Sequence, residues 1–245
     1  MSNICQPEWL IANCGAIFGS CIAAGVYATN LSDACHYIAS HSEAEVVVVD
    51  GNKQLKKFAE MKESLPALKA IVVYGEIVDP SLMKQSKVKV YAWEEFMALG
   101  RDVPDSALDQ RAASVKPGNC STLIYTSGTT GPPKAVMISH DNLTWTAKTM
   151  CESYIHVNHT ERLVSFLPLS HIAAQLIDIH VPMTLGAALY FAQPSALKGS
   201  LAKTLREVQP TVFFGVPRVW EKIHERMLQV LFTGVWILAI YINHT

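Results

Sequence analysis

The sequence predicts an α/β fold with mainly parallel sheets flanked by helices. Residues 46–50 (Val-Val-Val-Val-Asp) and 70–74 (Ala-Ile-Val-Val-Tyr) are nearly continuous apolar runs, as is typical of parallel strands buried on both faces. Stretches with apolar residues at helical spacing separate such runs, and this alternation favours parallel sheets. Half of the 245 residues are hydrophobic and 17% are charged, so the chain can bury a sizeable core and disorder is not expected.

The first third of the chain supplies most of the evidence for this alternation. A helix is expected from Pro7, because proline favours the first helical position, and the lack of charge between Glu8 and Asp33 predicts that this helix is buried. The seven-residue spacing of Cys14 and Cys21 places both on one face of a helix, as packing residues. Ser32 is expected to cap the next helix, and Ser139 or Asp141 to cap the later helix that runs to about Tyr154.

The remaining elements follow from the same periodicities and from glycine or proline at their ends. Expected helices are at residues 32–40, 52–64, 93–99, 139–154 and 170–183, the last followed by a turn at Gly186, with a further helix that ends at Val208 and one from Pro217 onward. Expected strands are at 88–91, 122–125, 135–138, 163–167, 187–192 and 211–215, with a strand or loop at 26–30 and a loop at 75–87.

Two segments differ from the rest in composition. Residues 101–119 are polar and contain Pro104, Pro117 and Gly118, which predicts a linker between subdomains. Residues 227–242 carry no charge, yet sixteen residues of helix span about 24 Å, short of the roughly 30 Å hydrocarbon layer of a bilayer. This end is therefore open to two interpretations, a membrane-dipping anchor or a core helix.

Charge and cysteine usage exclude several classes of protein. The net charge of −1 and the lack of a Lys/Arg block argue against a nucleic-acid partner. Six cysteines without a Cys-x-x-Cys pair favour a reduced, cytoplasmic protein. His156 and His159 have no third partner at a convincing spacing, so no metal site is predicted from the residues. Trp145 and Trp220 are expected to be packing residues.

The segment with the clearest chemistry is residues 126–134, between the expected strands at 122–125 and 135–138. It combines four hydroxyl side chains, two glycines, a proline pair and Lys134. Glycine lets backbone N–H groups curl around an anion, hydroxyls add donors, and an ammonium group suits a phosphate. These residues predict a phosphate-binding loop between two strands.

This loop does not match the two common nucleotide motifs. The P-loop needs four residues between its glycines and Ser or Thr after the lysine, whereas Gly128 and Gly131 are separated by two residues and Ala135 follows Lys134. No Gly-x-Gly-x-x-Gly is present for a dinucleotide. From composition alone, a Ser/Thr/Gly-rich surface hairpin is the alternative interpretation.

The order of residues 125–134, Tyr-Thr-Ser-Gly-Thr-Thr-Gly-Pro-Pro-Lys, resembles the phosphate-loop signature of the adenylate-forming (AMP-binding) enzymes. Residues 168–175 (Pro-Leu-Ser-His-Ile-Ala-Ala-Gln), 196–201 and 215–223 are similar to long-chain acyl-CoA synthetases of the bubblegum type. One departure is Ala135, where the family has glycine. The resemblance implies a partial N-terminal large domain over residues 1–228 and an apolar tail, 229–245, that does not match the family.

The resemblance also implies a reaction in two steps. A fatty carboxylate attacks the α-phosphorus of ATP, which gives an acyl adenylate and pyrophosphate, and coenzyme A then displaces AMP to form the thioester. ATP, Mg²⁺ and CoA are the implied cofactors and co-substrates, although the family's glutamate ligand for Mg²⁺ does not occur in this chain. The implied partner is a long- or very-long-chain fatty acid.

Several residues receive roles from this resemblance. Lys134 and His171 would be catalytic, with His171 near the reacting carboxylate, whereas a lone histidine is otherwise most often structural. Gln175 stands where some long-chain members have an aromatic gate to the acyl tunnel. The residues implied to bind the β- and γ-phosphates are Thr126, Ser127, Gly128, Thr129, Thr130, Gly131, Pro132, Pro133 and Lys134.

Other family elements are not found downstream of the loop, namely the Tyr-Gly-x-Thr-Glu and Thr-Gly-Asp motifs, the hinge and the small C-terminal domain. The expectation is therefore a fragment of a long-chain fatty-acid–CoA ligase that is inactive by itself. The alternative is an inactive truncated product that keeps phosphate binding or membrane association. The expected setting is cytoplasmic, with peripheral contact at the endoplasmic reticulum or other membranes as an alternative.

Overall fold

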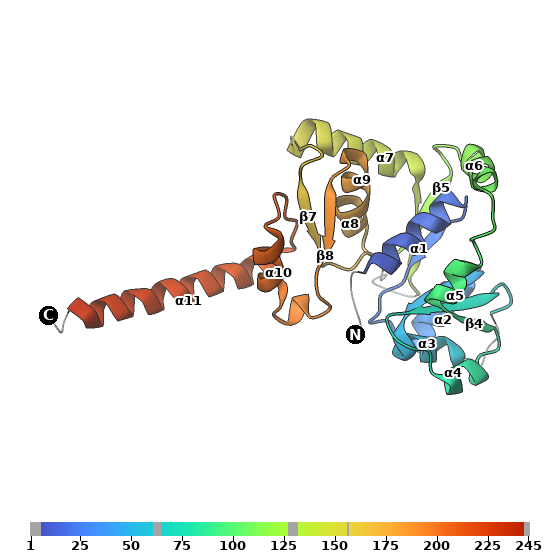
Figure 1. Ribbon diagram of the computed structural model, residues 1–245, viewed down its shortest axis with the longest axis horizontal. Coiled ribbons are helices and arrows are strands. Elements are labelled where there is room, and N and C mark those ends of the chain that lie inside the picture. Colours follow the sequence, from blue (N-terminus) through green and yellow to red (C-terminus); the bar gives the residue numbers. More distant parts are fainter. Residues whose placement is uncertain (1–5, 61–64, 127–131, 156, 243–245) are drawn as a thin grey trace. The chain divides into compact units, whose positions relative to one another are not determined.

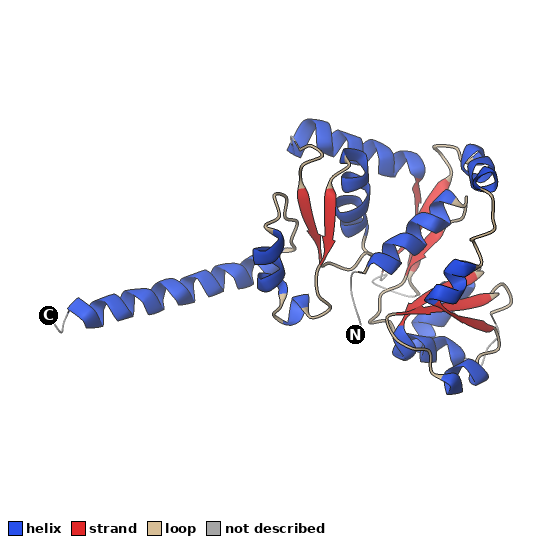
Figure 2. Cartoon of the chain, viewed as in Figure 1, coloured by secondary structure: helices blue, strands red, loops and turns tan. Residues whose placement is uncertain are grey.

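The computed structural model describes residues 6–60, 65–126, 132–155 and 157–242, and the chain divides into two units, Met1–Val212 and Phe213–Thr245 (Figure 1). Each unit is described by itself. The first unit contains three sheets whose strands alternate with helices along the chain (Figure 2). The predicted α/β class with mainly parallel sheets is therefore confirmed.

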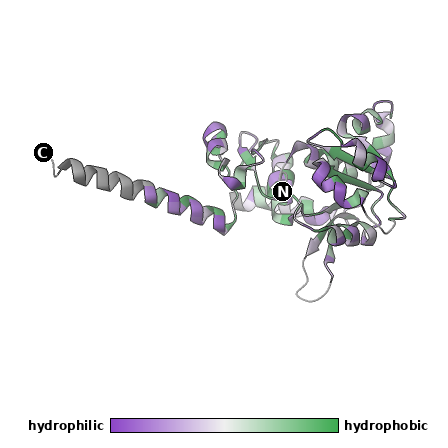
Figure 3. Cartoon of the chain, turned by 90° about the horizontal axis from the view of Figure 1, so that it is seen from below, coloured by the Kyte–Doolittle hydropathy of each residue, from purple (hydrophilic) through white to green (hydrophobic). Residues whose placement is uncertain are grey.

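The first complete parallel sheet has the order β2-β3-β4, with β2 at Val46–Asp50, β3 at Ala70–Tyr74 and β4 at Lys89–Ala92. Every residue of β3 is buried, as predicted. Strand β2 lies at the edge of the sheet, and its Val46 is exposed. The predicted burial on both faces is therefore wrong for β2. These strands are mainly hydrophobic in Figure 3.

Helix α3 (Gly51–Ala59) covers this sheet, and residues 61–64 of the predicted helix lie outside the described residues. Its Leu55 has no exposed surface. Burial of such a side chain contributes about 1.5–3 kcal/mol. The buried members of this apolar cluster are Val49, Leu55, Ala59, Leu68, Ile71, Val73, Val78, Leu82 and Val90.

The second sheet has the order β1-β5-β6 and contains the one antiparallel pair among the described strands. Strand β1 (Ala23–Gly25) pairs parallel with β5 (Cys120–Thr126), and β6 (Lys134–Ser139) pairs antiparallel with β5. The hydroxyl of the fully buried Thr122 donates to the carbonyl oxygen of Ala23 at 2.9 Å. The hairpin of β5 and β6 is the predicted pair of strands on either side of the loop.

The third sheet consists of β7 (Arg162–Ser165) and β8 (Ala188–Phe191), which are parallel. Between them runs one helical stretch made of α8 (Ile172–Gln175), a π-helical turn η2 (Leu176–His180) and α9 (Val181–Leu185). This agrees with the predicted helix at 170–183. Gly186 ends it with a left-handed φ of 70°, which suits glycine.

Helix α7 (His140–Thr149) contacts this stretch and continues as the π-helix η1 (Met150–Ile155). Of the two predicted caps, Ser139 is correct. Its hydroxyl accepts from the Asn142 N–H, and Asn142 reaches back to the Ser139 N–H. This reciprocal pair satisfies two donors at the start of the helix.

The amino-terminal helix α1 (Pro7–Phe18) begins at Pro7 as predicted, but it is not buried. Asn13 is its one buried residue, and Phe18 is 48% exposed. Because the helix ends at Phe18, Cys21 lies outside it and does not share a helical face with Cys14. Helix α2 (Ser32–His41) begins at Ser32, with Leu31 at the cap position, so Ser32 is not the cap.

Two helices occur where the sequence predicted none, and one predicted strand is missing. Helix α4 (Pro80–Gln85) lies in the expected loop, and Asp79 caps it by accepting from the Ser81 N–H at 2.8 Å. Helix α6 (Asp105–Ser114) occupies the segment that was predicted as a linker, while α5 (Trp93–Ala98) is as expected. Residues 211–215 form only a single bridge between Leu163 and Val212.

Past β8, the first unit ends with the short 3-10 helix η3 (Ala196–Lys198) and α10 (Leu201–Val208). The second unit consists mainly of α11 (Pro217–Ile242), which begins at Pro217 as predicted and continues through most of the apolar tail. The Trp220 indole N–H donates to the Gly215 carbonyl oxygen at 3.1 Å. The Trp220 ring packs edge-on against the ring of Phe213. Among the described helices, none is both long and apolar enough to cross a bilayer.

Candidate functional site

The end of the β5–β6 hairpin carries the described part of the predicted phosphate loop. Thr126, the last residue of β5, lies opposite Lys134, the first residue of β6, and both are exposed. Pro132 and Pro133 lead directly into Lys134. The remaining predicted loop residues, Ser127, Gly128, Thr129, Thr130 and Gly131, lie outside the described part of the chain. A hydroxyl and an ammonium group at one solvent-facing hairpin end fit an anionic ligand.

Helix α2 contacts both stems of this hairpin. The Tyr37 hydroxyl donates to the carbonyl oxygen of Pro133 at 3.0 Å. On the other stem, the Tyr125 hydroxyl lies 3.0 Å from Nδ1 of His41. The rings of Tyr37 and His41 stack with their centroids 5.4 Å apart, and His41 meets the Tyr125 ring edge-on. Burial raises the pKa of the Tyr125 phenol, so this hydroxyl stays protonated at neutral pH.

His171 lies at the start of α8, directly after the turn that follows β7. Its Nδ1 accepts a hydrogen bond from the Ala173 N–H at 3.2 Å, so the imidazole caps the helix. Because Nδ1 accepts, the neutral ring carries its proton on Nε2 and can donate it to an oxygen of a ligand. The side chain is exposed, as a residue that meets a substrate must be.

A close backbone approach links the His171 turn to the hairpin sheet. A Cβ atom at Gly25 would lie 3.0 Å from the Ser170 Cα and 3.2 Å from its Cβ, which is tighter than most contacts of a Cβ atom in proteins. Gly25 on β1 is paired with Ile124 of β5, two residues before Thr126. The residue next to His171 therefore packs against the strand that adjoins the loop-bearing strand, and glycine permits this spacing.

Behind His171, the helical stretch buries polar side chains. The Ser165 hydroxyl donates to the Asp178 carboxylate at 2.7 Å, and burial raises the pKa of Asp178 to about 7. Gln175, the residue at the expected gate position, has no exposed surface, and neither of its amide atoms has a partner within the described residues. No sequence signal predicted that these groups would be buried together.

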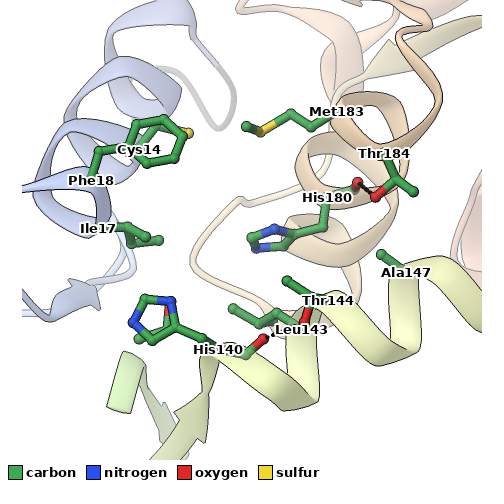
Figure 4. Close-up of a pocket in the computed structure, with 11 residues that line it drawn as sticks. Cys14, Ile17, Phe18, His140, Leu143, Thr144, Ala147, His180, Met183 and Thr184 are labelled. Carbon is green, nitrogen blue, oxygen red and sulfur yellow. Dashed lines mark hydrogen bonds between the residues drawn. The ribbon is translucent and has the colours of Figure 1, made fainter. Parts of the chain in front are cut away.

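A pocket of about 260 Å³ lies between α1, α7 and α9. Figure 4 shows the His180 ring and the Met183 side chain pointing into it, with His140 on its other side. Burial, together with the nearby His140, lowers the pKa of His180 to about 4, so its ring is neutral at pH 7. The fully buried Ser121 hydroxyl also lines the pocket and has no partner in the described part of the chain.

Two other sequence-based interpretations can be compared with the structure. Trp145 is 65% exposed, so its prediction as a packing residue is wrong. The described residues hold no group of three His, Cys, Asp or Glu side chains that could bind a metal. His156, one of the two histidines considered for such a site, is outside the described residues.

Comparison with known proteins adds three findings. A family model described as "AMP-binding enzyme" matches residues 5–234. The "Long-chain-fatty-acid--CoA ligase ACSBG2" of Xenopus laevis is 55% identical over 228 residues, which are 92% of this chain and 30% of that protein. The protein of the same name in Homo sapiens is 48% identical over 221 residues, 90% of this chain and 32% of that one.

The fold is also found among solved structures. The adenylation domain AlmE of Vibrio cholerae, in complex with glycyl-adenosine-5'-phosphate, has a TM-score of 0.70 at 19% identity. The match covers 89% of this chain and 40% of that domain. The chain thus spans less than a third of the length of the two named sequence relatives and less than half of this structural one.

Proposed function

This chain belongs to the family of AMP-binding enzymes, and on that premise we propose that it is part of an ATP-dependent long-chain fatty-acid–CoA ligase. Its identity of 48–55% with proteins that carry this name supports the assignment of the substrate class. The structural observation that carries the proposal is the hairpin end where Thr126 and Lys134 lie opposite each other and face solvent. The proposal for the described residues concerns the adenylation step.

In that step, a carboxylate oxygen of the fatty acid forms a bond to the α-phosphorus of ATP while the bond to pyrophosphate breaks. Lys134 would bind the β- and γ-phosphates and stabilise the negative charge that develops on the departing pyrophosphate. The Thr126 hydroxyl and the predicted donors of residues 127–131 would add hydrogen bonds to the same oxygens. A charge-assisted hydrogen bond of this kind contributes about 1.5–3 kcal/mol.

His171 would orient the attacking carboxylate. Its Nδ1 is occupied by the Ala173 N–H, so Nε2–H is the group that can donate to a carboxylate oxygen. Proximity and orientation account for much of the rate enhancement of such reactions. We assign His171 this positioning role and assign no proton transfer to it.

Mg²⁺ and coenzyme A are part of the proposal only for the longer protein. The described residues offer no group of acidic side chains that fits Mg²⁺, so no step is assigned to a metal here. No residue of this chain is assigned to coenzyme A. A cytoplasmic enzyme with peripheral membrane contact would suit a substrate that partitions into bilayers.

The direct test is binding of MgATP and of pyrophosphate to the chain, measured by isothermal titration calorimetry. Lys134→Ala should weaken both by about tenfold to a hundredfold, since one charge-assisted contact is lost. Lys148→Ala is the matched control, because Lys148 is an exposed lysine on α7 that pairs with Glu152. Equal affinities of wild type and Lys134→Ala would contradict the proposal.

Turnover is a separate measurement. We expect no oleate-driven exchange of pyrophosphate into ATP from this chain alone, even when it binds ATP. Exchange above the level of the Lys134→Ala variant would show that the described residues are sufficient for adenylation. Binding of MgATP or pyrophosphate without exchange would agree with a chain that binds the phosphates but is inactive by itself.

A further inference from the structure

Tyr37 and His41 on α2 are the residues that hold the two stems of the phosphate-binding hairpin, and we propose that both are positioning residues for phosphate binding. This inference rests on the proposed function, because the loop must bind phosphates for its position to matter. Neither residue would touch the nucleotide. Each acts through a hairpin residue, Tyr37 through Pro133 and His41 through Tyr125.

The contact of Tyr37 fixes the peptide group that precedes Lys134. The carbonyl carbon of Pro133 is bonded to the Lys134 nitrogen, and the peptide unit between them is planar. A hydrogen bond to the Pro133 oxygen at 3.0 Å therefore restrains the orientation of this whole unit, including the Cα of Lys134. This restraint and the pairing of Lys134 with Thr126 in the β ladder together determine the direction in which the lysine side chain leaves the backbone.

The contact of His41 fixes the opposite stem one residue before Thr126. Tyr125 is 6% exposed, and a buried phenol requires a hydrogen-bond partner. Nδ1 of His41 supplies that partner at 3.0 Å, and the edge-on ring contact adds to it. This pair keeps the end of β5 against α2.

The two contacts act together because their residues are neighbours on one helix. Tyr37 and His41 are four residues apart, so they lie on the same face of α2, and their rings stack at 5.4 Å with an angle of 28° between planes. Pairing of β5 with β6 fixes the stems relative to each other, but β1 pairs with β5 only as far as Ile124, so the hairpin end has two strands, and a two-stranded pair is only marginally stable by itself. The attachment to α2 restrains the hairpin end as a whole.

The test uses Tyr37→Phe, which keeps the ring and its stacking and removes one hydroxyl. We expect affinity for MgATP and pyrophosphate to fall by about threefold to tenfold, as for the loss of one neutral hydrogen bond. The melting temperature should change little, because Pro133 is only half-buried and water can replace the lost donor. Tyr91→Phe, on β4 of the other sheet, is the matched control and should bind as the wild type does.

A thermodynamic cycle separates positioning from general stabilisation. If Tyr37 acts through Lys134, Tyr37→Phe should have a clearly smaller effect in the Lys134→Ala background than in the wild type. An equal effect in both backgrounds would overturn the inference. For the other stem, His41→Leu should weaken binding, whereas His41→Asn, which retains an acceptor near the place of Nδ1, should restore part of it.

Hydrogen exchange gives a readout that does not require nucleotide binding. Amides of residues 134–136 should exchange about tenfold faster in Tyr37→Phe than in wild type or Tyr91→Phe. Unchanged exchange would overturn the inference even if ATP does not bind. If the wild type fails to bind ATP or pyrophosphate, the proposed function fails, whereas normal binding by Tyr37→Phe removes only the role of Tyr37.

Discussion

The sheets β2-β3-β4 and β1-β5-β6 are built from similar short strands, but their buried residues differ in kind. Every buried side chain of β3 except the phenol of Tyr74 is a hydrocarbon. In β5, by contrast, Ser121 and Thr122 are completely buried, and Tyr125 is hydrogen-bonded to a helix. The buried side chains of β3 contribute packing, whereas β5 also buries two hydroxyl groups and, through Tyr125, is hydrogen-bonded to α2 next to the hairpin end. Residues that stabilise the fold by packing are therefore distinct from residues that hold the candidate site in position.

The largest expected effect is in the apolar sheet. Leu55→Ala should lower the free energy of unfolding by about 2–5 kcal/mol, because it leaves a cavity in a fully buried cluster. Urea denaturation measures this, with Leu99→Ala, at an exposed leucine, as the control. Binding of MgATP by the folded fraction should be unchanged. Loss of binding by correctly folded Leu55→Ala would break the separation between the two sheets.

The next effect concerns the buried carboxyl of Asp178, on the helical stretch between β7 and β8. The pKa of Asp178 is raised from 3.8 to about 7, so the folded chain holds this proton more tightly than the unfolded chain. Stability from this group is complete below pH 3.8 and is lost as pH rises through about 7. Asp178→Asn should therefore increase the free energy of unfolding at pH 8 by about 2–4 kcal/mol and change little at pH 4.

His180 has the opposite pH dependence. Its pKa is lowered from 6.5 to about 4, so its contribution is lost as pH falls from 6.5 towards 4. In wild type, the stability gained as Asp178 takes up its proton offsets the stability lost through His180 as pH falls from 6.5 towards 4. In Asp178→Asn only the loss through His180 remains, so the free energy of unfolding should decrease as pH falls from 6.5. Chemical denaturation at several pH values measures this change. A variant with the flat profile of wild type would contradict the assignment of both groups.

A reciprocal exchange of valine and threonine sharpens the comparison of the first two sheets. Val72→Thr adds a hydroxyl to the fully buried β3 and should cost about 1–3 kcal/mol. Thr122→Val removes the hydrogen bond to the Ala23 carbonyl and should cost about 1 kcal/mol. Chemical denaturation measures both. Similar stability of Thr122→Val and wild type would mean that the polar interior of β5 is not needed for its pairing with β1.

The smallest expected effect is at the surface. Trp145→Gln should change the free energy of unfolding by less than about 0.5 kcal/mol, because the indole is mostly exposed. Thermal denaturation in parallel with Thr122→Val measures it. A larger loss would show that this tryptophan packs as the sequence suggested.

The sequence was sufficient where one local pattern determined the element. The strand at residues 70–74, the helix start at Pro7, the cap at Ser139 and the end at Gly186 agree with the structure because periodicity or terminal residues specify them. Helix α4 was missed, although Asp79 followed by Pro80 is a recognisable start signal. The strand expected at 211–215 has high β propensity, but it makes only one bridge.

The site was predictable only as far as its residues are contiguous in the chain. The hydroxyls, glycines and lysine of residues 126–134 could be recognised from their order. Tyr37 and His41 could not, because they lie more than eighty residues before the residues that they contact and have no motif of their own. The burial of Asp178 and His180 was also hidden, since it depends on which faces of a partly π-helical stretch contact neighbouring helices.

The contact at Gly25 has a consequence for variation among related sequences. A single methyl group there would lie 3.0 Å from the Ser170 Cα, so Ser170 would have to shift by a few tenths of an ångström. Ser170 precedes His171 directly, so that shift would be passed to the imidazole, while Lys134 stays in its pairing with Thr126. An alanine at position 25 would therefore disturb the placement of His171 without replacing His171 or Lys134.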